Sequence, residues 1–125
     1  MSLKTTKIVF WITTGIIFLF EGVMPGLTGL SDLAYEGITS LGYPRYFVPI
    51  LTVAKVLGAL TIIIPKMPAR LKEWAYAGFT FNLLCAFISH WVVKGMDGQT
   101  IFPLVILAIL MTSYFTYHKL KASSN

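Results

Sequence analysis

The sequence predicts an all-α integral membrane protein built as a four-helix bundle, and two observations support this fold class. The chain has 125 residues, of which 56% are hydrophobic and only 12% are charged, whereas soluble domains carry roughly 25% charged residues. A soluble core of this size has no room for so much apolar surface. The apolar residues also fall into four long runs that are separated by short segments rich in Pro, Gly and cations.

The four runs cover about residues 8–24, 47–64, 74–93 and 101–117. Each is close to the ~20 residues that an α-helix needs to cross ~30 Å of hydrocarbon. Pro25 and Gly26 follow the first run, Pro65 follows the second and Gly95 follows the third, as expected for helix ends. We therefore expect residues 1–125 to form a single transmembrane domain.

The connection between the first two spans is long enough to form a structure of its own. Ser31 can cap a short amphipathic helix there, and Gly42 and Pro44 can end it. The apolar residues that we expect on its bundle-facing side are Leu30, Leu33, Ile38 and Leu41. We expect this helix to lie over the outer mouth of the bundle as a lid.

The cations predict the orientation, because Lys and Arg beside membrane spans are retained in the cytoplasm. With the N-terminus inside, the cytoplasmic cations are Lys4, Lys7, Lys66, Arg70, Lys72, Lys119 and Lys121, and only Arg45 and Lys94 are outside. Both termini are therefore expected in the cytoplasm. If the source is a bacterium, we expect the protein in the inner membrane. The net charge of +5 is thus explained by topology, and we expect no nucleic acid partner.

Three of the spans each carry one ionisable residue deep inside: Glu21, Lys55 and His90. Such a residue costs about 2.5–3.5 kcal/mol at the bilayer centre, so it commonly faces a partner or a cavity. A rise of ~1.5 Å per residue places Glu21 ~10 Å, Lys55 ~12 Å and His90 ~6 Å below the outer boundary. The three therefore share one layer, and we take them as the candidate catalytic residues of a polar pocket in the outer half.

Further candidates surround this layer. Asn82 shares a helical face with His90, and Tyr43 and Trp91 lie near the outer boundary, so these three are candidate ligand-binding residues. An interhelical hydrogen bond for Asn82 and interfacial positions for the two aromatic residues are the alternatives. The single cysteine, Cys85, excludes an internal disulfide and a cysteine zinc site, and we expect no metal site.

Several strings resemble the DoxX-like family of small four-span membrane proteins. They are LGYP at 41–44, PKMP at 65–68, KEWAYAGF at 72–79 and the pair Ser89-His90. The resemblance implies a four-helix membrane bundle and a link to quinone-coupled oxidoreductases. It carries over no catalytic residue.

Three functions are consistent with the predicted pocket. The leading hypothesis is a small hydrophobic ligand, such as a quinone, with Lys55 and His90 donating hydrogen bonds to its carbonyl oxygens and Glu21 taking up protons, as part of a membrane oxidoreductase system. The second is a cofactor-free isomerase or lyase that uses these groups as acid and base on a lipophilic substrate. The third is a non-catalytic scaffold or chaperone in which Glu21 and Lys55 pair to fix helix register.

The cofactor and the partners follow from these hypotheses. The cofactor is left open between a quinone and, less favoured, a haem bound through His90, because His118 lies at the opposite boundary and cannot be a second ligand in the same chain. The expected partners are the lipid bilayer, the hydrophobic ligand and membrane oxidoreductase subunits. A second copy of the chain is a further candidate, since Gly15, Gly22 and Gly58 would allow close packing between chains.

Overall fold

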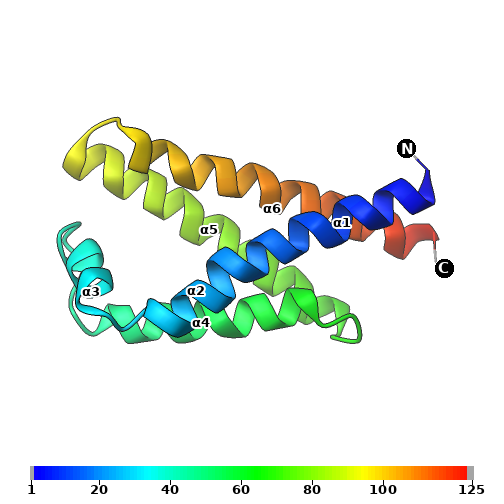
Figure 1. Cartoon of the computed structure of the whole chain (residues 1–125), viewed down its shortest axis with the longest axis horizontal. Coiled ribbons are helices and arrows are strands. Elements are labelled where there is room, and N and C mark those ends of the chain that lie inside the picture. The colour runs from blue at the N-terminus through cyan, green and yellow to red at the C-terminus, as the bar shows by residue number, and fades with distance from the viewer. Residues whose placement is uncertain (1, 124–125) are drawn as a thin grey trace.

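The computed structural model describes residues 2–123, and over these residues it is helical with no strand, which confirms the all-α class (Figure 1). The elements are α1 (Leu3–Phe18), the π-helical turn η1 (Leu19–Val23), α2 (Met24–Thr28), α3 (Asp32–Thr39), α4 (Phe47–Ile63), α5 (Ala69–Lys94) and α6 (Gly98–Ser123). The first three form one continuous helical segment. The predicted amphipathic helix is α3, which Ser31 caps by accepting a hydrogen bond from the Ala34 backbone N–H.

The long helices run between two ends of the molecule. At one end, which we call the terminal end, lie both chain termini and the α4–α5 turn of residues 64–68; at the other, the lid end, lie α3 and the α5–α6 turn of residues 95–97 (Figure 1). Neighbouring helices pack α1 against α6, α6 against α5 and α5 against α4, while η1 and α2 pack on α4.

Three helical segments are long and apolar enough to cross a membrane: Leu3–Thr28, Ala69–Lys94 and Thr100–Ala122. The fourth apolar helix, Phe47–Ile63, has 17 residues, a length of ~26 Å. The four-span topology and the orientation of the termini therefore stay predictions. The third span begins five residues before the expected boundary, at Ala69, because Pro68 in an extended conformation starts the helix ahead of its charged first turns.

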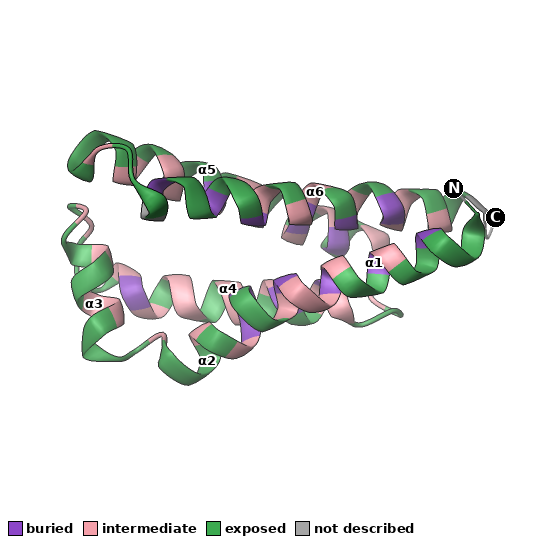
Figure 2. Ribbon diagram, turned by 45° about the horizontal axis from the view of Figure 1, so that its top comes forward, coloured by how far each residue is buried: buried purple, intermediate pink, exposed green. Residues whose placement is uncertain are grey.

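The core lies along the faces that the helices turn toward one another (Figure 2). Its members come from all four long helical segments: Ile17, Ala59, Ile62, Tyr76, Phe79, Leu83, Ile106 and Leu110. Large apolar side chains also cover the outside, such as Val92 at 78% exposure and Phe115 at 65%. An apolar core combined with an apolar exterior is the pattern expected of a bundle surrounded by lipid.

A buried polar cluster ties three helices together near the middle of the bundle. The Ser113 hydroxyl of α6 lies 2.6 Å from that of Thr14 on α1 and 2.7 Å from that of Tyr76 on α5. All three side chains are essentially buried. Hydrogen bonds of this kind replace the hydrophobic driving force that helices lack inside lipid.

Two of the glycines allow helices of the same chain to approach. A Cβ on Gly22 would lie 2.6 Å from the Cβ of Ala59, and one on Gly58 would lie 3.0 Å from the Phe79 ring. These glycines therefore serve contacts within the chain. At Gly15 a Cβ would meet nothing within 4 Å, so of the three glycines considered for contacts between chains this one faces open space, and the homo-oligomer stays a prediction.

Candidate ligand site at the lid end

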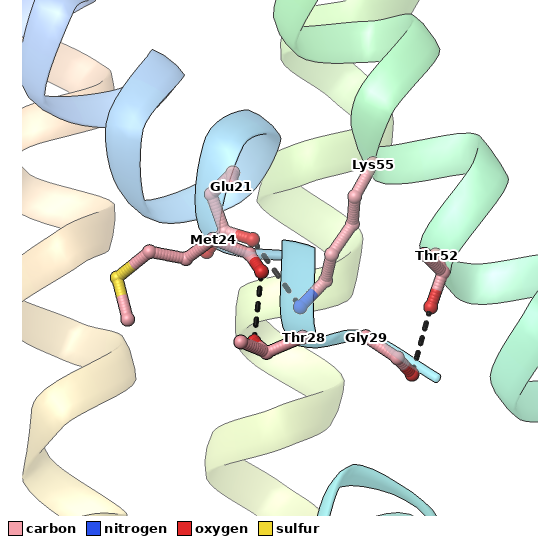
Figure 3. Close-up of polar contacts among 6 residues, drawn as sticks. All are labelled: Glu21, Met24, Thr28, Gly29, Thr52 and Lys55. Atoms are coloured by element: carbon pink, nitrogen blue, oxygen red, sulfur yellow. Dashed lines mark hydrogen bonds and ion pairs between the residues drawn. The ribbon is translucent and has the colours of Figure 1, made fainter. Parts of the chain in front are cut away.

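The structure brings Glu21 and Lys55 together as an ion pair. Lys55 Nζ lies 3.2 Å from Glu21 Oε2, and the side chains are 25% and 8% exposed (Figure 3). Oε2 is buried and has no hydrogen-bond partner besides this ionic contact. Beside the pair, the Thr52 hydroxyl of α4 donates to the Gly29 carbonyl at 3.2 Å and holds the end of α2 against α4 (Figure 3).

The π-helical turn explains how Glu21 reaches α4. In a regular α-helix, residues seven apart lie within about 20° of each other, so Thr14 and Glu21 would share a face. In the structure Thr14 bonds to α6 and Glu21 pairs with α4. Each residue of η1 (Leu19–Val23) turns the chain through a smaller angle than an α-helical residue does, which redirects Glu21.

Lys55 lines two small cavities, one on each side of α4. A cavity of about 210 Å³ lies beneath α2 and α3 and includes Thr52 and Ile38. A second, of about 200 Å³, lies between α4 and α5 and includes Asn82 and Trp74. Both are smaller than the ~300–1,000 Å³ that is typical of ligand pockets.

His90 lines a larger cleft of about 710 Å³ at the lid end, which is within the range of ligand pockets. The cleft is formed by α3, the end of α5 and the first turns of α6, and its lining residues are Leu33, Glu36, Gly37, Ser40, His90, Lys94, Gly98, Phe102 and Pro103. The ring atom Nδ1 of His90 is buried and has no hydrogen-bond partner. Since buried polar atoms are nearly always paired, this atom marks the cleft as a binding site candidate.

The lid helix α3 separates the His90 cleft from the Lys55 cavity beneath it. Its residues Leu33 and Glu36 line the cleft, while Ala34 and Ile38, on another face of the helix, line the cavity. The two spaces share no lining residue. Of the apolar residues expected on a single face of the lid, Leu33 thus lines the cleft and Ile38 the cavity, and of the predicted ionisable residues His90 lines the cleft and Lys55 the cavity.

The comparisons with known proteins identify the family. Residues 9–113 match the DoxX-like family. The chain belongs to this family. Neither the curated proteins nor the solved structures contain a match. This DoxX-like chain, with its three long apolar helices, is therefore an integral membrane protein.

The remaining predicted residues of the DoxX-like chain have separate positions. The Tyr43 hydroxyl lies 2.6 Å from that of Ser89, so Tyr43 fastens the segment after α3 to α5, one residue from His90. Asn82 lines the small α4–α5 cavity, and Trp91 is 53% exposed with its ring 5.6 Å from that of Phe87. Neither of these two residues lines the His90 cleft.

Two charged residues of the cleft were not among the predicted site residues. Glu36 and Lys94 line it together with His90. Glu36 lies in the short helix α3 and Lys94 is the last residue of α5. Charged residues are common at such positions outside the membrane core, so only the prediction of a lid over the pocket indicated that these two could reach the site.

A second polar cluster of this DoxX-like chain lies toward the terminal end. His118 Nε2 lies 2.5 Å from one carboxylate oxygen of Glu73, and the Tyr114 hydroxyl donates to the other at 2.9 Å. The cluster links α5 to α6 and is about 40% exposed at Glu73 and His118. His118 therefore has a partner, in contrast to His90 Nδ1.

Proposed function

We propose that this DoxX-like protein binds a small hydrophobic ligand with a carbonyl or hydroxyl group in the cleft beside α3. The observation that carries the proposal is a cleft of about 710 Å³ lined by His90, whose buried Nδ1 has no hydrogen-bond partner. An unsatisfied buried polar atom costs about 1–3 kcal/mol. Either tautomer of the imidazole offers one partner for a ligand, since a protonated Nδ1 donates and an unprotonated one accepts.

A quinone is the ligand class that we favour. Its carbonyl oxygen can accept a hydrogen bond from His90, and its flat ring suits the apolar walls that Leu33 and Phe102 provide. Lys94 supplies a second donor at the same cleft. A quinone ligand would associate the protein with a membrane oxidoreductase system. In a bacterium, this system would be located at the inner membrane.

Glu21 and Lys55 enter this proposal as positioning residues. Their ion pair joins η1 to α4 on the far side of α3 from the His90 cleft. We propose that the pair fixes the floor on which α3 rests. We propose that Tyr43 acts by holding the lid segment to Ser89, whereas Asn82 lines the separate cavity between α4 and α5 and Trp91 packs against Phe87.

The second candidate function is acid–base catalysis on a lipophilic substrate, and it is supported by the position of Glu36. A carboxylate and an imidazole that line one cleft can act as general base and general acid. The variant Glu36→Gln distinguishes the two functions. Under the ligand-binding proposal it leaves quinone affinity within about twofold, whereas catalysis predicts loss of turnover by a factor of about 10²–10⁴.

The test uses the fact that the chain has two histidines. Protein labelled with ¹⁵N in the histidine rings and held in lipid nanodiscs is titrated with decylubiquinone, and His90→Gln and His118→Gln assign the two ring signals. We expect the ring signal of His90 to move and that of His118 to stay, because His118 bonds to Glu73 outside the cleft. His118→Gln is the matched control and should retain the binding.

Unchanged His90 signals at saturating quinone, or equal movement of both histidines, would reject the quinone. Native mass spectrometry of protein purified from its own membranes then separates the alternatives. A retained apolar molecule that His90→Gln loses supports ligand binding in the cleft. A bare chain bound to other membrane proteins supports the scaffold and overturns the proposal.

A further inference from the structure

A second large cleft, of about 530 Å³, lies at the terminal end of the molecule and shares no lining residue with the proposed ligand site. Lysines from three helices line it: Lys7 on α1, Lys72 on α5 and Lys121 on α6. Its walls are apolar and aromatic, with Trp11 and Tyr117 among them. None of the described residues that line it is an Asp or a Glu.

Lys72 is the unusual member of this group, because its side chain is almost fully buried at 3% exposure. Its Nζ donates to the carbonyls of Thr61 and Ile62 at 3.1 and 3.0 Å, at the C-terminal end of α4. The Tyr117 ring lies 5.7 Å from the same nitrogen. In the described part of the chain no carboxylate pairs with Lys72.

A buried ammonium group normally has an anionic partner, since leaving the charge unpaired in a low-dielectric site is costly. The helix-end carbonyls supply partial negative charge and use two of the three N–H donors of Lys72. The adjacent residue Glu73 cannot complete the site, because it binds His118 and Tyr114 and lines a different cavity. Among the described residues, no carboxylate therefore occupies the position that Lys72 offers to an anion in this cleft.

We infer that this cleft binds the head group of an anionic phospholipid, with the phosphate near Lys7 and Lys72. The walls favour a lipid over free phosphate, because Leu3, Phe10 and Ile63 provide apolar surface that only an acyl chain can use. Basic pockets between helix ends are also the sites at which membrane proteins bind anionic lipids. This inference does not depend on the ligand proposed for the His90 cleft.

The experiment uses Trp11 as the reporter, because it lines the cleft. The two other tryptophans, Trp74 and Trp91, are 67% and 53% exposed and are replaced by Phe. The protein is placed in phosphatidylcholine nanodiscs that contain increasing fractions of dibrominated phosphatidylglycerol. Parallel discs contain dibrominated phosphatidylcholine, and a third series adds inorganic phosphate to the phosphatidylglycerol discs.

We expect phosphatidylglycerol to quench Trp11 at a lower mole fraction than phosphatidylcholine, with no competition from millimolar phosphate. Lys7→Gln should raise the half-quenching fraction about fivefold, the factor that corresponds to ~1 kcal/mol per lysine. Lys4→Gln is the matched control: it removes an exposed lysine of α1 that does not line the cleft, and it should change nothing. Lys7→Gln carries the test because Lys72 also holds the end of α4.

Three results would overturn the inference. Equal quenching by the two lipids would mean that the head-group charge is not recognised. Equal losses in Lys4→Gln and Lys7→Gln would mean that the attraction is diffuse surface charge and not a site. Full competition by inorganic phosphate would assign the cleft to free phosphate.

Discussion

The Glu21–Lys55 ion pair gives a quantitative prediction about stability. Replacing Lys55 by Met shortens the side chain by one atom and removes its charge, which leaves the Glu21 carboxylate at 8% side-chain exposure without a counter-ion. The reverse change, Glu21→Gln, leaves a Lys55 that is one quarter exposed. Because a long lysine side chain can move its ammonium toward water, the two single changes should differ in cost.

The separation of 3.2 Å sets the size of the effect. At an effective dielectric constant of 20, the attraction at this distance is ~5 kcal/mol before desolvation is counted. Screening at the exposed side of Lys55 reduces it. We expect Lys55→Met to lower the free energy of unfolding by about 3 kcal/mol, the low end of the range for breaking a buried pair. Glu21→Gln should lower it by about 1 kcal/mol, and the double variant by about 2 kcal/mol less than the sum.

The assay is reversible unfolding in mixed micelles of dodecylmaltoside and sodium dodecyl sulfate, followed by circular dichroism, for the four proteins of the double-mutant cycle. Lys66→Met serves as the control, because Lys66 is an exposed lysine in the α4–α5 turn. Costs of the two single changes that add within ~0.3–0.5 kcal/mol would refute the reasoning, since independent sites behave in that way.

Two further predictions concern the packing of η1 and the anchoring of the lid. Gly22→Ala should destabilise the protein by about 1–3 kcal/mol through overpacking against Ala59. Gly15→Ala, whose added methyl group meets nothing within 4 Å, should be neutral or stabilising by up to ~1 kcal/mol. The same unfolding assay measures both variants, and equal effects would contradict the close contact between Gly22 and Ala59. Tyr43→Phe removes the bond to Ser89 and should speed hydrogen exchange of α3 by about fivefold, for a net bond of ~1 kcal/mol. Tyr46→Phe, at 71% exposure, is its control, and equal exchange in the two variants would show that the lid is held elsewhere.

The sequence was sufficient for the features that depend on composition and local signals. The apolar runs, Pro65 and Pro68 led to α4 and α5, and Ser31 with Gly42 led to α3. Hydropathy alone did not place the helix ends, because a charged residue such as Lys72 is left out of a predicted apolar span. In the structure Lys72 belongs to α5, and its ammonium group donates to the last carbonyls of α4 inside the bundle.

The arrangement of the candidate site could be predicted only in part. The proximity of Glu21 and Lys55 follows from their equal depth and opposite charge. Their separation from the His90 cleft does not, because it depends on where α3 rests, and its residues Leu33 and Ile38 line different spaces. The contacts of Ser113 with Thr14 and Tyr76 were missed for another reason: single hydroxyl residues are common in membrane helices, and only their meeting in space makes a cluster.

The π-helical turn η1 (Leu19–Val23) has a consequence for the evolution of the chain. Deleting one residue within it would restore a regular α-helix and move the position of the acidic residue around the helix axis relative to Thr14. A relative with such a deletion could not keep both the α6 contact made by Thr14 and the α4 contact made by Glu21. Insertions and deletions at this turn should therefore be inherited together with the acidic residue, so that the length of the first span and the presence of its carboxylate change as one trait.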